Sequence, residues 1–96
     1  LQYLSVSRNN LHDIELSIIV KLLEDFSHDL KHLNISHNKV NLKTSLNIQS
    51  LISKPNCKIK SINLSHNYMG DENFTKISVG ISKNTSITKI WLCNNN

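Results

Sequence analysis

The side chains best suited to catalysis in this 96-residue chain are two adjacent serine–histidine pairs, Ser36-His37 and Ser65-His66. A histidine can act as the base for a serine nucleophile, but it must itself be oriented by a third group, usually a carboxylate. All seven acidic residues fall in predicted turns or helices, away from these pairs. The two glycines are isolated, so the sequence also lacks a phosphate-binding glycine loop. We therefore predict a non-enzymatic protein without catalytic residues, a small-molecule substrate or a cofactor.

The same histidines and the two cysteines are the residues most able to bind a metal. His37 and His66 occupy one repeat position, and parallel strands would place their backbones roughly 5 Å apart. A metal would need further ligands, but the neighbours at that position are an arginine and an asparagine. Cys57 and Cys93 form no CxxC pair, so they do not indicate a zinc or redox motif. We predict no metal site, and a pH-sensitive contact between the imidazoles is the alternative.

These side chains recur because the chain is an internal repeat. The segment at 33–38, Leu-Asn-Ile-Ser-His-Asn, returns at 62–67 as Ile-Asn-Leu-Ser-His-Asn, with related copies at 4–9 and 90–95. The last asparagines of the copies are 29, 29 and 28 residues apart. A fixed period in this range is typical of a solenoid, in which a unit buries its apolar stripe by stacking on the next. We expect one domain, residues 1–96, with repeats at 1–29, 30–58 and 59–86 and a partial repeat at 87–96, in a fragment of a longer protein.

Each repeat predicts a short strand followed by a helix. In Leu4-Ser5-Val6-Ser7 apolar and polar residues alternate, which is typical of a strand with one buried face. The first helix is expected over 14–26, with Asp13 as its N-cap. Its predicted buried stripe follows steps of three and four residues. The members of that stripe are Leu16, Ile19, Val20, Leu23 and Phe26.

The other two helices follow from the same reasoning. The second should end at Lys54-Pro55, because a residue before proline avoids the helical region. Its predicted stripe is Leu46, Ile48, Leu51 and Ile52. The third should begin at Gly70-Asp71-Glu72 and bury Phe74, Ile77 and Ile81.

The asparagine that closes each strand segment predicts a structural ladder. An asparagine amide can both donate and accept hydrogen bonds, so it can satisfy turn backbone groups inside the stack. The four ladder positions are Asn9, Asn38, Asn67 and Asn95.

The third repeat carries a resemblance to a known family. It reads Asn-Tyr-Met-Gly-Asp-Glu at 67–72, followed by the apolar helix residues and by Lys-Asn-Thr-Ser-Ile at 83–87. It resembles the 28–29-residue leucine-rich repeat of the ribonuclease-inhibitor type, and the resemblance extends over the whole chain. It implies an α/β solenoid, a right-handed β-α superhelix with a parallel sheet on the concave face and helices on the convex face. Repeats one and two depart from it, with His12 in place of glycine and Asn41-Leu42 in place of Gly-Asp.

The resemblance also implies function. Its members include ribonuclease inhibitor, the repeat domains of nucleotide-binding innate receptors and tropomodulin-like actin regulators, which bind other proteins. We therefore predict a protein–protein interaction module or scaffold that binds its partner through the concave face. The alternatives are a part of a regulatory protein, such as a GTPase-activating protein or an innate-receptor-like sensor, and a polyanion-binding surface.

The outward strand positions are the predicted binding residues. They carry four basic side chains and no acidic one, so an acidic protein partner is expected. An ordinary solvated face in a lysine-rich protein is the competing interpretation. Nucleic acid is disfavoured, because the few aromatic residues are not interleaved with lysines. The predicted partner-binding residues are Arg8, Lys31, His32, Asn34, His37, Lys60, Asn63, His66, Lys89 and Trp91.

The sequence also bears on location. No run approaches the ~20 apolar residues of a membrane span. Two cysteines without a disulfide pattern favour a reducing compartment, so we expect a cytoplasmic protein.

Overall fold

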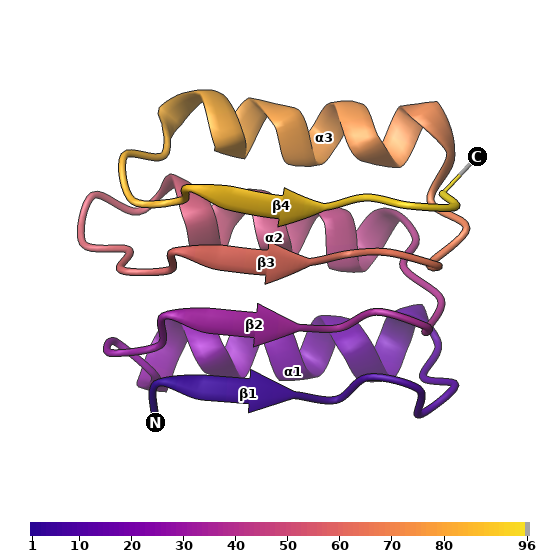
Figure 1. Ribbon diagram of the computed structural model, residues 1–96, viewed down its shortest axis with the longest axis horizontal. Coiled ribbons are helices and arrows are strands. Elements are labelled where there is room, and N and C mark those ends of the chain that lie inside the picture. The colour runs from indigo at the N-terminus through magenta and orange to yellow at the C-terminus, as the bar shows by residue number, and fades with distance from the viewer. Residues whose placement is uncertain (96) are drawn as a thin grey trace.

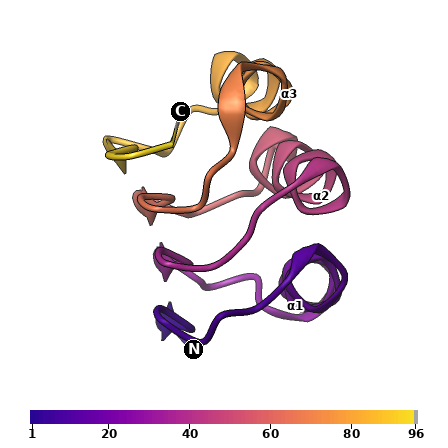
Figure 2. The same ribbon diagram turned by 90° about the vertical axis from the view of Figure 1, so that its right-hand side faces the viewer.

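The computed structural model describes residues 1–95 and alternates strands with helices throughout. Its four strands form one parallel sheet in the order β1-β2-β3-β4, and the helices make a second layer on one side of it (Figures 1 and 2). This confirms the predicted α/β solenoid. The elements are β1 (Tyr3–Ser5), α1 (Asp13–Phe26), β2 (His32–Asn34), α2 (Leu42–Ser53), β3 (Ser61–Asn63), α3 (Gly70–Lys83) and β4 (Lys89–Trp91).

Equivalent positions of successive repeats lie side by side in the sheet. The central strand residues pair as Leu4 with Leu33, Leu33 with Ile62 and Ile62 with Ile90. These side chains point toward the helices, where the core also includes Ile48 and other fully buried residues. Because strand side chains alternate between faces, the residues on either side of each central position must point away from the helices.

The asparagine side chains join the repeats at the ends of the strands. The Oδ1 of Asn67 accepts the backbone N–H of Asn38 at 3.2 Å, and the Oδ1 of Asn95 accepts that of Asn67 at 2.8 Å. The Nδ2 of Asn67 donates to the carbonyls of Ile35, Leu64 and Ser65. The amides of Asn38, Asn67 and Asn95 therefore satisfy backbone groups of their own repeat and of the repeat before it.

The start of α1 differs from the prediction that Asp13 caps it. Residue His12 is the N-cap, and its backbone N–H donates to Glu15 Oε1 at 2.9 Å. The Asp13 carboxylate instead accepts three backbone N–H groups at the start of α2, each at 3.0 Å. The donors are Asn41, Lys43 and Thr44. The first turn of α2 has no acidic residue of its own, so a carboxylate from the preceding repeat supplies the negative charge that a helix start favours.

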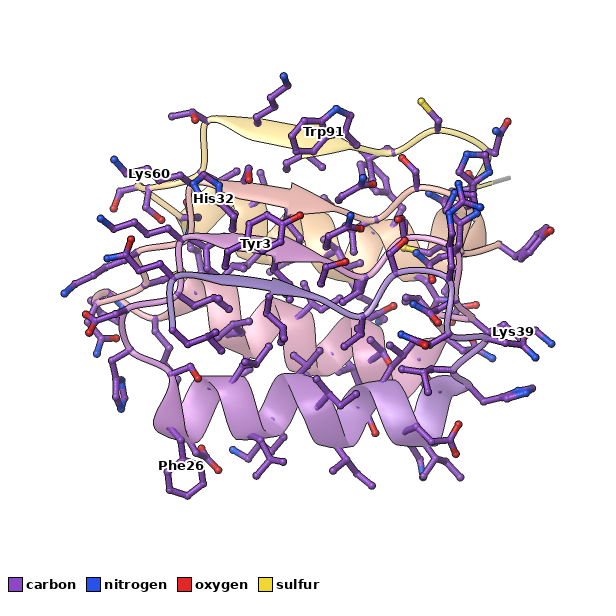
Figure 3. All side chains as sticks on the ribbon, turned by 60° about the horizontal axis from the view of Figure 1, so that its bottom comes forward. Tyr3, Phe26, His32, Lys39, Lys60 and Trp91 are labelled. Carbon is purple, nitrogen blue, oxygen red and sulfur yellow. The ribbon has the colours of Figure 1, made fainter. Side chains whose placement is uncertain are left out.

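Three residues assigned to the buried helix stripes are exposed. Phe26 is 76% exposed, because it is the last residue of α1 and projects beyond the packed layer (Figure 3). Leu46 is 45% exposed, because the buried face of α2 runs instead through Ser45, Ile48 and Ile52. Phe74 is 38% exposed, on the last of the described helices. The α2 end at Lys54-Pro55 and the α3 start at Gly70 are confirmed.

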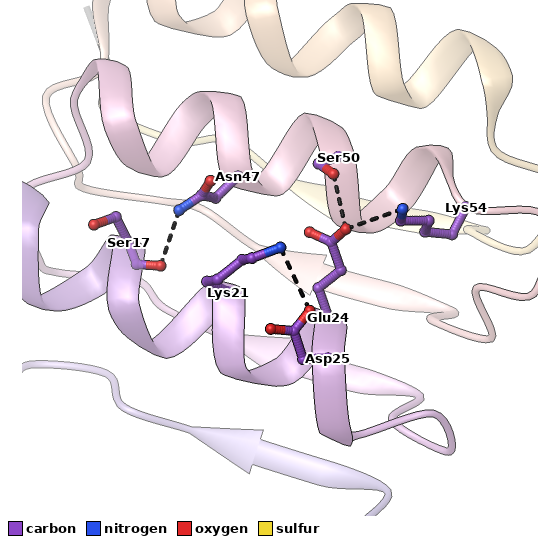
Figure 4. A network of polar contacts seen from close by, with 7 residues as sticks. All are labelled: Ser17, Lys21, Glu24, Asp25, Asn47, Ser50 and Lys54. Carbon is purple, nitrogen blue, oxygen red and sulfur yellow. Dashed lines mark hydrogen bonds and ion pairs between the residues drawn. The ribbon is translucent and has the colours of Figure 1, made fainter.

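The contact between α1 and α2 is partly polar (Figure 4). Asn47 Nδ2 donates to the Ser17 carbonyl at 3.0 Å. The Glu24 side chain, only 6% exposed, accepts the Ser50 hydroxyl at 2.9 Å and lies 3.2 Å from Lys54 Nζ. Paired polar groups of this kind keep the two helices in a fixed register beside their buried apolar residues.

Candidate interaction surface

The sheet face turned away from the helices consists of side-chain rows that cross all four strands. The strand registers place Tyr3, His32, Ser61 and Lys89 in one row and Ser5, Asn34, Asn63 and Trp91 in the next. No acidic residue occurs in β1 to β4. The surface thus combines imidazole, hydroxyl, amide, ammonium and aromatic groups over a regular backbone.

Side chains of these two rows line an open hollow of about 330 Å³ on the surface of the sheet. Tyr3 lies toward one side of the hollow and Trp91, on β4, toward the other; their side chains are 60% and 38% exposed (Figure 3). Its lining residues are Tyr3, His32, Leu33, Asn34, Ser61, Asn63 and Trp91.

Hydrogen bonds fix several of the lining side chains. His32 Nδ1 and the Ser61 hydroxyl are 2.6 Å apart, and the ring centres of His32 and Tyr3 are separated by 6.4 Å. Trp91 is held by the ammonium group of Lys89, which lies 4.6 Å from the centre of the indole ring. A cation over an aromatic face is attracted by the ring quadrupole, so this contact holds the Lys89 ammonium group beside Trp91.

The basic residues gather where the strands begin. Lys31 and Lys60 directly precede β2 and β3, and Lys89 is the first residue of β4. Figure 3 shows Lys60 at this end of the strands. Within residues 1–95, the three ion pairs use other lysines, namely Lys21 with Asp25, Lys54 with Glu24 and Lys58 with Asp29. The three strand-end lysines therefore keep their charges available to a partner.

The opposite ends of the strands hold a second group of predicted residues. His37 and His66 stack with ring centres 4.2 Å apart and planes 13° from parallel, and Asn94 Nδ2 lies 3.2 Å from His66 Nδ1. Partial desolvation, the Arg8 guanidinium and His66 together lower the pKa of His37 below its ordinary value. Arg8, His37, His66 and Asn94 all have positive φ, so they form tight turns rather than strand positions.

The structure thus divides the ten predicted binding residues into three places. His32, Asn34, Asn63 and Trp91 line the hollow, while the three lysines lie where the strands begin. Arg8, His37 and His66 lie apart, in the turns after the strands. Among the described residues, no three of His, Cys, Asp and Glu come together as a metal-binding group.

Two features of the site differ from the sequence interpretation. Ser36 and Ser65, which the alternation of polar and apolar residues in the repeat places among the outward positions, are buried. Their hydroxyl oxygens lie 2.9 Å from the Ser7 hydroxyl and 3.1 Å from the Cys93 backbone nitrogen. Tyr3 and Ser61 line the hollow but were not among the predicted binding residues. Their place in the same row as His32 is the signal that could have identified them.

Comparison with known proteins agrees with this architecture. The family model described as Leucine Rich Repeat matches residues 29–51, which span β2 and most of α2. That repeat is typical of protein–protein interaction modules. No curated protein matches the chain. Within residues 1–95, every helix is too short or too polar to reach across a lipid bilayer.

Proposed function

We propose that this solenoid, which contains a leucine-rich repeat, is a non-enzymatic interaction module that binds a protein partner through the concave sheet face. The observation that carries the proposal is the hollow on that face, bordered by exposed Tyr3 and Trp91. Aromatic side chains of this kind are common anchors of protein interfaces, because they bury a large area with few rotatable bonds.

Charge favours an acidic partner. The chain carries a formal net charge of +4, and Lys31, Lys60 and Lys89 lie where the strands begin, without an ion-pair partner among the described residues. A positive surface accelerates the approach of a negative partner and disfavours positive ones.

We further propose that the repeats are of the ribonuclease-inhibitor-like subtype. Each of the first three repeats combines a strand with a full helix of 12 or 14 residues, and the two strand registers between these repeats step by 29 residues. The continuous sheet supports treating the chain as one repeat domain.

The test is affinity capture from the source cell with three forms of the chain. The first is unmodified, and the second carries Lys31→Glu, Lys60→Glu and Lys89→Glu on the sheet side. The third, a matched control, carries the same charge change on the helices, at the exposed lysines Lys21, Lys43 and Lys83. Circular dichroism checks that all three are folded.

We expect the same protein to be captured by the unmodified chain and the helix-side variant and to be lost from the sheet-side variant. Equal capture by all three forms would contradict a basic sheet-side interface. Equal loss from both variants would show that overall charge, rather than the concave face, governs binding.

A further inference from the structure

The two asparagines in the hollow have a fixed orientation. Asn34 Oδ1 accepts the Ser36 backbone N–H at 3.0 Å and the Ser36 hydroxyl at 2.7 Å. Asn63 Oδ1 accepts the Ser65 backbone N–H at 3.0 Å. A backbone N–H can donate only to the oxygen of an amide, so these bonds determine which end of each side chain is oxygen.

The nitrogen ends of the same amides are therefore the groups left for a ligand. Among the described residues, neither the Nδ2 of Asn34 nor that of Asn63 has a hydrogen-bond partner, although both side chains are partly buried and line the hollow. The two residues are paired on neighbouring strands, which run ~4.8 Å apart. Two amide NH₂ groups thus stand side by side as hydrogen-bond donors, while the Asn34 oxygen already accepts two bonds and the Asn63 oxygen one.

The rest of the hollow favours the same kind of ligand. The indole N–H of Trp91 is a donor without acceptor capacity, and the Lys89 ammonium group lies over its ring. No acidic side chain lines the hollow. A ligand that pairs with the two amide nitrogens and the indole N–H must bring hydrogen-bond acceptors, and a negative charge on it would be stabilised by the Lys89 ammonium group.

We infer that the hollow is a carboxylate-binding pocket, which receives an aspartate or glutamate side chain of the partner protein between Asn34 and Asn63. A carboxylate has two acceptor oxygens, so one group can accept from both amides, which a neutral amide or a hydroxyl cannot do as well. Trp91 then packs against the apolar part of the same partner segment. This inference rests on the proposed function and specifies what the concave face recognises.

The experiment measures binding of two defined peptides by ¹⁵N NMR, using the side-chain NH₂ signals of Asn34 and Asn63 and the Trp91 indole signal. The probes are acetyl-(Gly-Glu)₃-Gly-amide and the same peptide with glutamine in place of glutamate. Binding of the glutamate peptide should shift these three signals saturably, and the glutamine peptide should bind at least about tenfold more weakly.

The variant for this test is Asn34→Asp with Asn63→Asp. An aspartate keeps the oxygen that accepts the turn N–H groups, so the turns retain their bonds, but each donor is replaced by a negative oxygen. We expect at least a tenfold loss of affinity for the glutamate peptide. The charge-matched control, Lys39→Gln with Lys83→Gln, lowers the net charge by the same two units outside the hollow and should change the affinity less than twofold.

Equal affinity for the two peptides, or an equal loss from the control variant, would overturn the carboxylate pocket. The absence of a saturable shift would do the same. Because the peptide titration does not involve the cellular partner, the pocket can fail while the capture experiment still locates the interface on the concave face. Conversely, the titration can show carboxylate binding while capture does not depend on the sheet-side lysines. That result would support the carboxylate pocket and contradict the proposed interface with an acidic partner.

Discussion

The carboxylate of Asp13 accepts the backbone N–H of Thr44 at 3.0 Å, so a residue of one repeat caps the helix of the next. The Thr44 hydroxyl returns a bond to the Asp13 carbonyl at 3.0 Å. We expect Asp13→Ala to destabilise the chain by about 1 kcal/mol, which is common for the loss of a helix cap. Urea unfolding followed by circular dichroism measures it, and Asp25→Ala on the same helix is the control. Asp25 makes only an exposed ion pair, so a loss there as large as at Asp13 would contradict the capping role.

The Asp13 carboxylate should also make the free energy of unfolding depend on pH in the acidic range. Burial raises the pKa of Asp13, but the hydrogen bonds from Thr44, Asn41 and Lys43 outweigh it and lower the pKa below the ordinary value of 3.8. Because the pKa of Asp13 is lower in the folded than in the unfolded chain, its ionised carboxylate stabilises the fold at pH values above the unfolded-state pKa. This stabilisation is lost as the pH falls through the folded-state pKa. Unfolding titrations between pH 2 and 6 should therefore show a smaller acid dependence for Asp13→Asn than for the unmodified chain.

The asparagine ladder predicts that alanine substitutions lower the free energy of unfolding more at inner positions than at the first position. Asn67→Ala removes four hydrogen bonds and leaves buried backbone groups unpaired, so we expect a loss of about 1–3 kcal/mol. Asn9 is exposed and makes one bond, from Nδ2 to the Val6 carbonyl at 2.9 Å. Asn9→Ala should therefore cost clearly less. Equal losses in urea unfolding would mean that the ladder bonds add little to stability.

At Gly80, α3 packs directly against α2. A Cβ at this position would lie 2.7 Å from Ile52 Cγ1 and 3.0 Å from the Gln49 carbonyl oxygen, and Ile52 is completely buried. Alanine improves helix propensity by roughly 1 kcal/mol, but overpacking costs roughly 1–3 kcal/mol. We expect Gly80→Ala to lower the melting temperature and Ser82→Ala, at an exposed position of the same helix, to leave it unchanged or raise it. A stabilised Gly80→Ala variant would show that the two helices can separate at little cost.

The stacked imidazoles predict a second pH dependence. The lowered pKa of His37 means that the unfolded chain binds this proton more readily than the folded chain. Stability should therefore fall as pH drops below about 6.5, the ordinary histidine value, until the folded-state pKa is reached. His37→Asn should remove this part of the dependence, because asparagine tolerates the positive φ of 58° and does not titrate. Melting temperatures between pH 5 and 8 provide the measurement, and an unchanged pH profile would contradict it.

The fold could be predicted because it depends on the period of the apolar and asparagine positions, which is visible without coordinates. The same period aligned His37 with His66, and their rings do stack. The sequence could not show which polar side-chain groups are already hydrogen-bonded within the fold. Asn34 and Ser36 looked equivalent as outward polar residues, yet Ser36 is buried.

The errors in the helices have a related cause. The prediction for Asp13 assumed that a cap serves its own helix, whereas its partners lie 28 to 31 residues ahead. Leu46 was assigned to the core because leucine is apolar, but Ser45 holds the buried position next to it. Local rules cannot distinguish such neighbours, because the choice depends on the helix packed alongside.

The strand register has a consequence for how the chain folds. Within residues 1–95, packed elements are neighbours in the stack. The side-chain hydrogen bonds that join different repeats connect residues no more than 32 positions apart. The entropy cost of closing a loop rises with the number of residues enclosed. Here that cost is set by a single repeat, so adding repeats would lengthen the structure without making any individual contact slower to form.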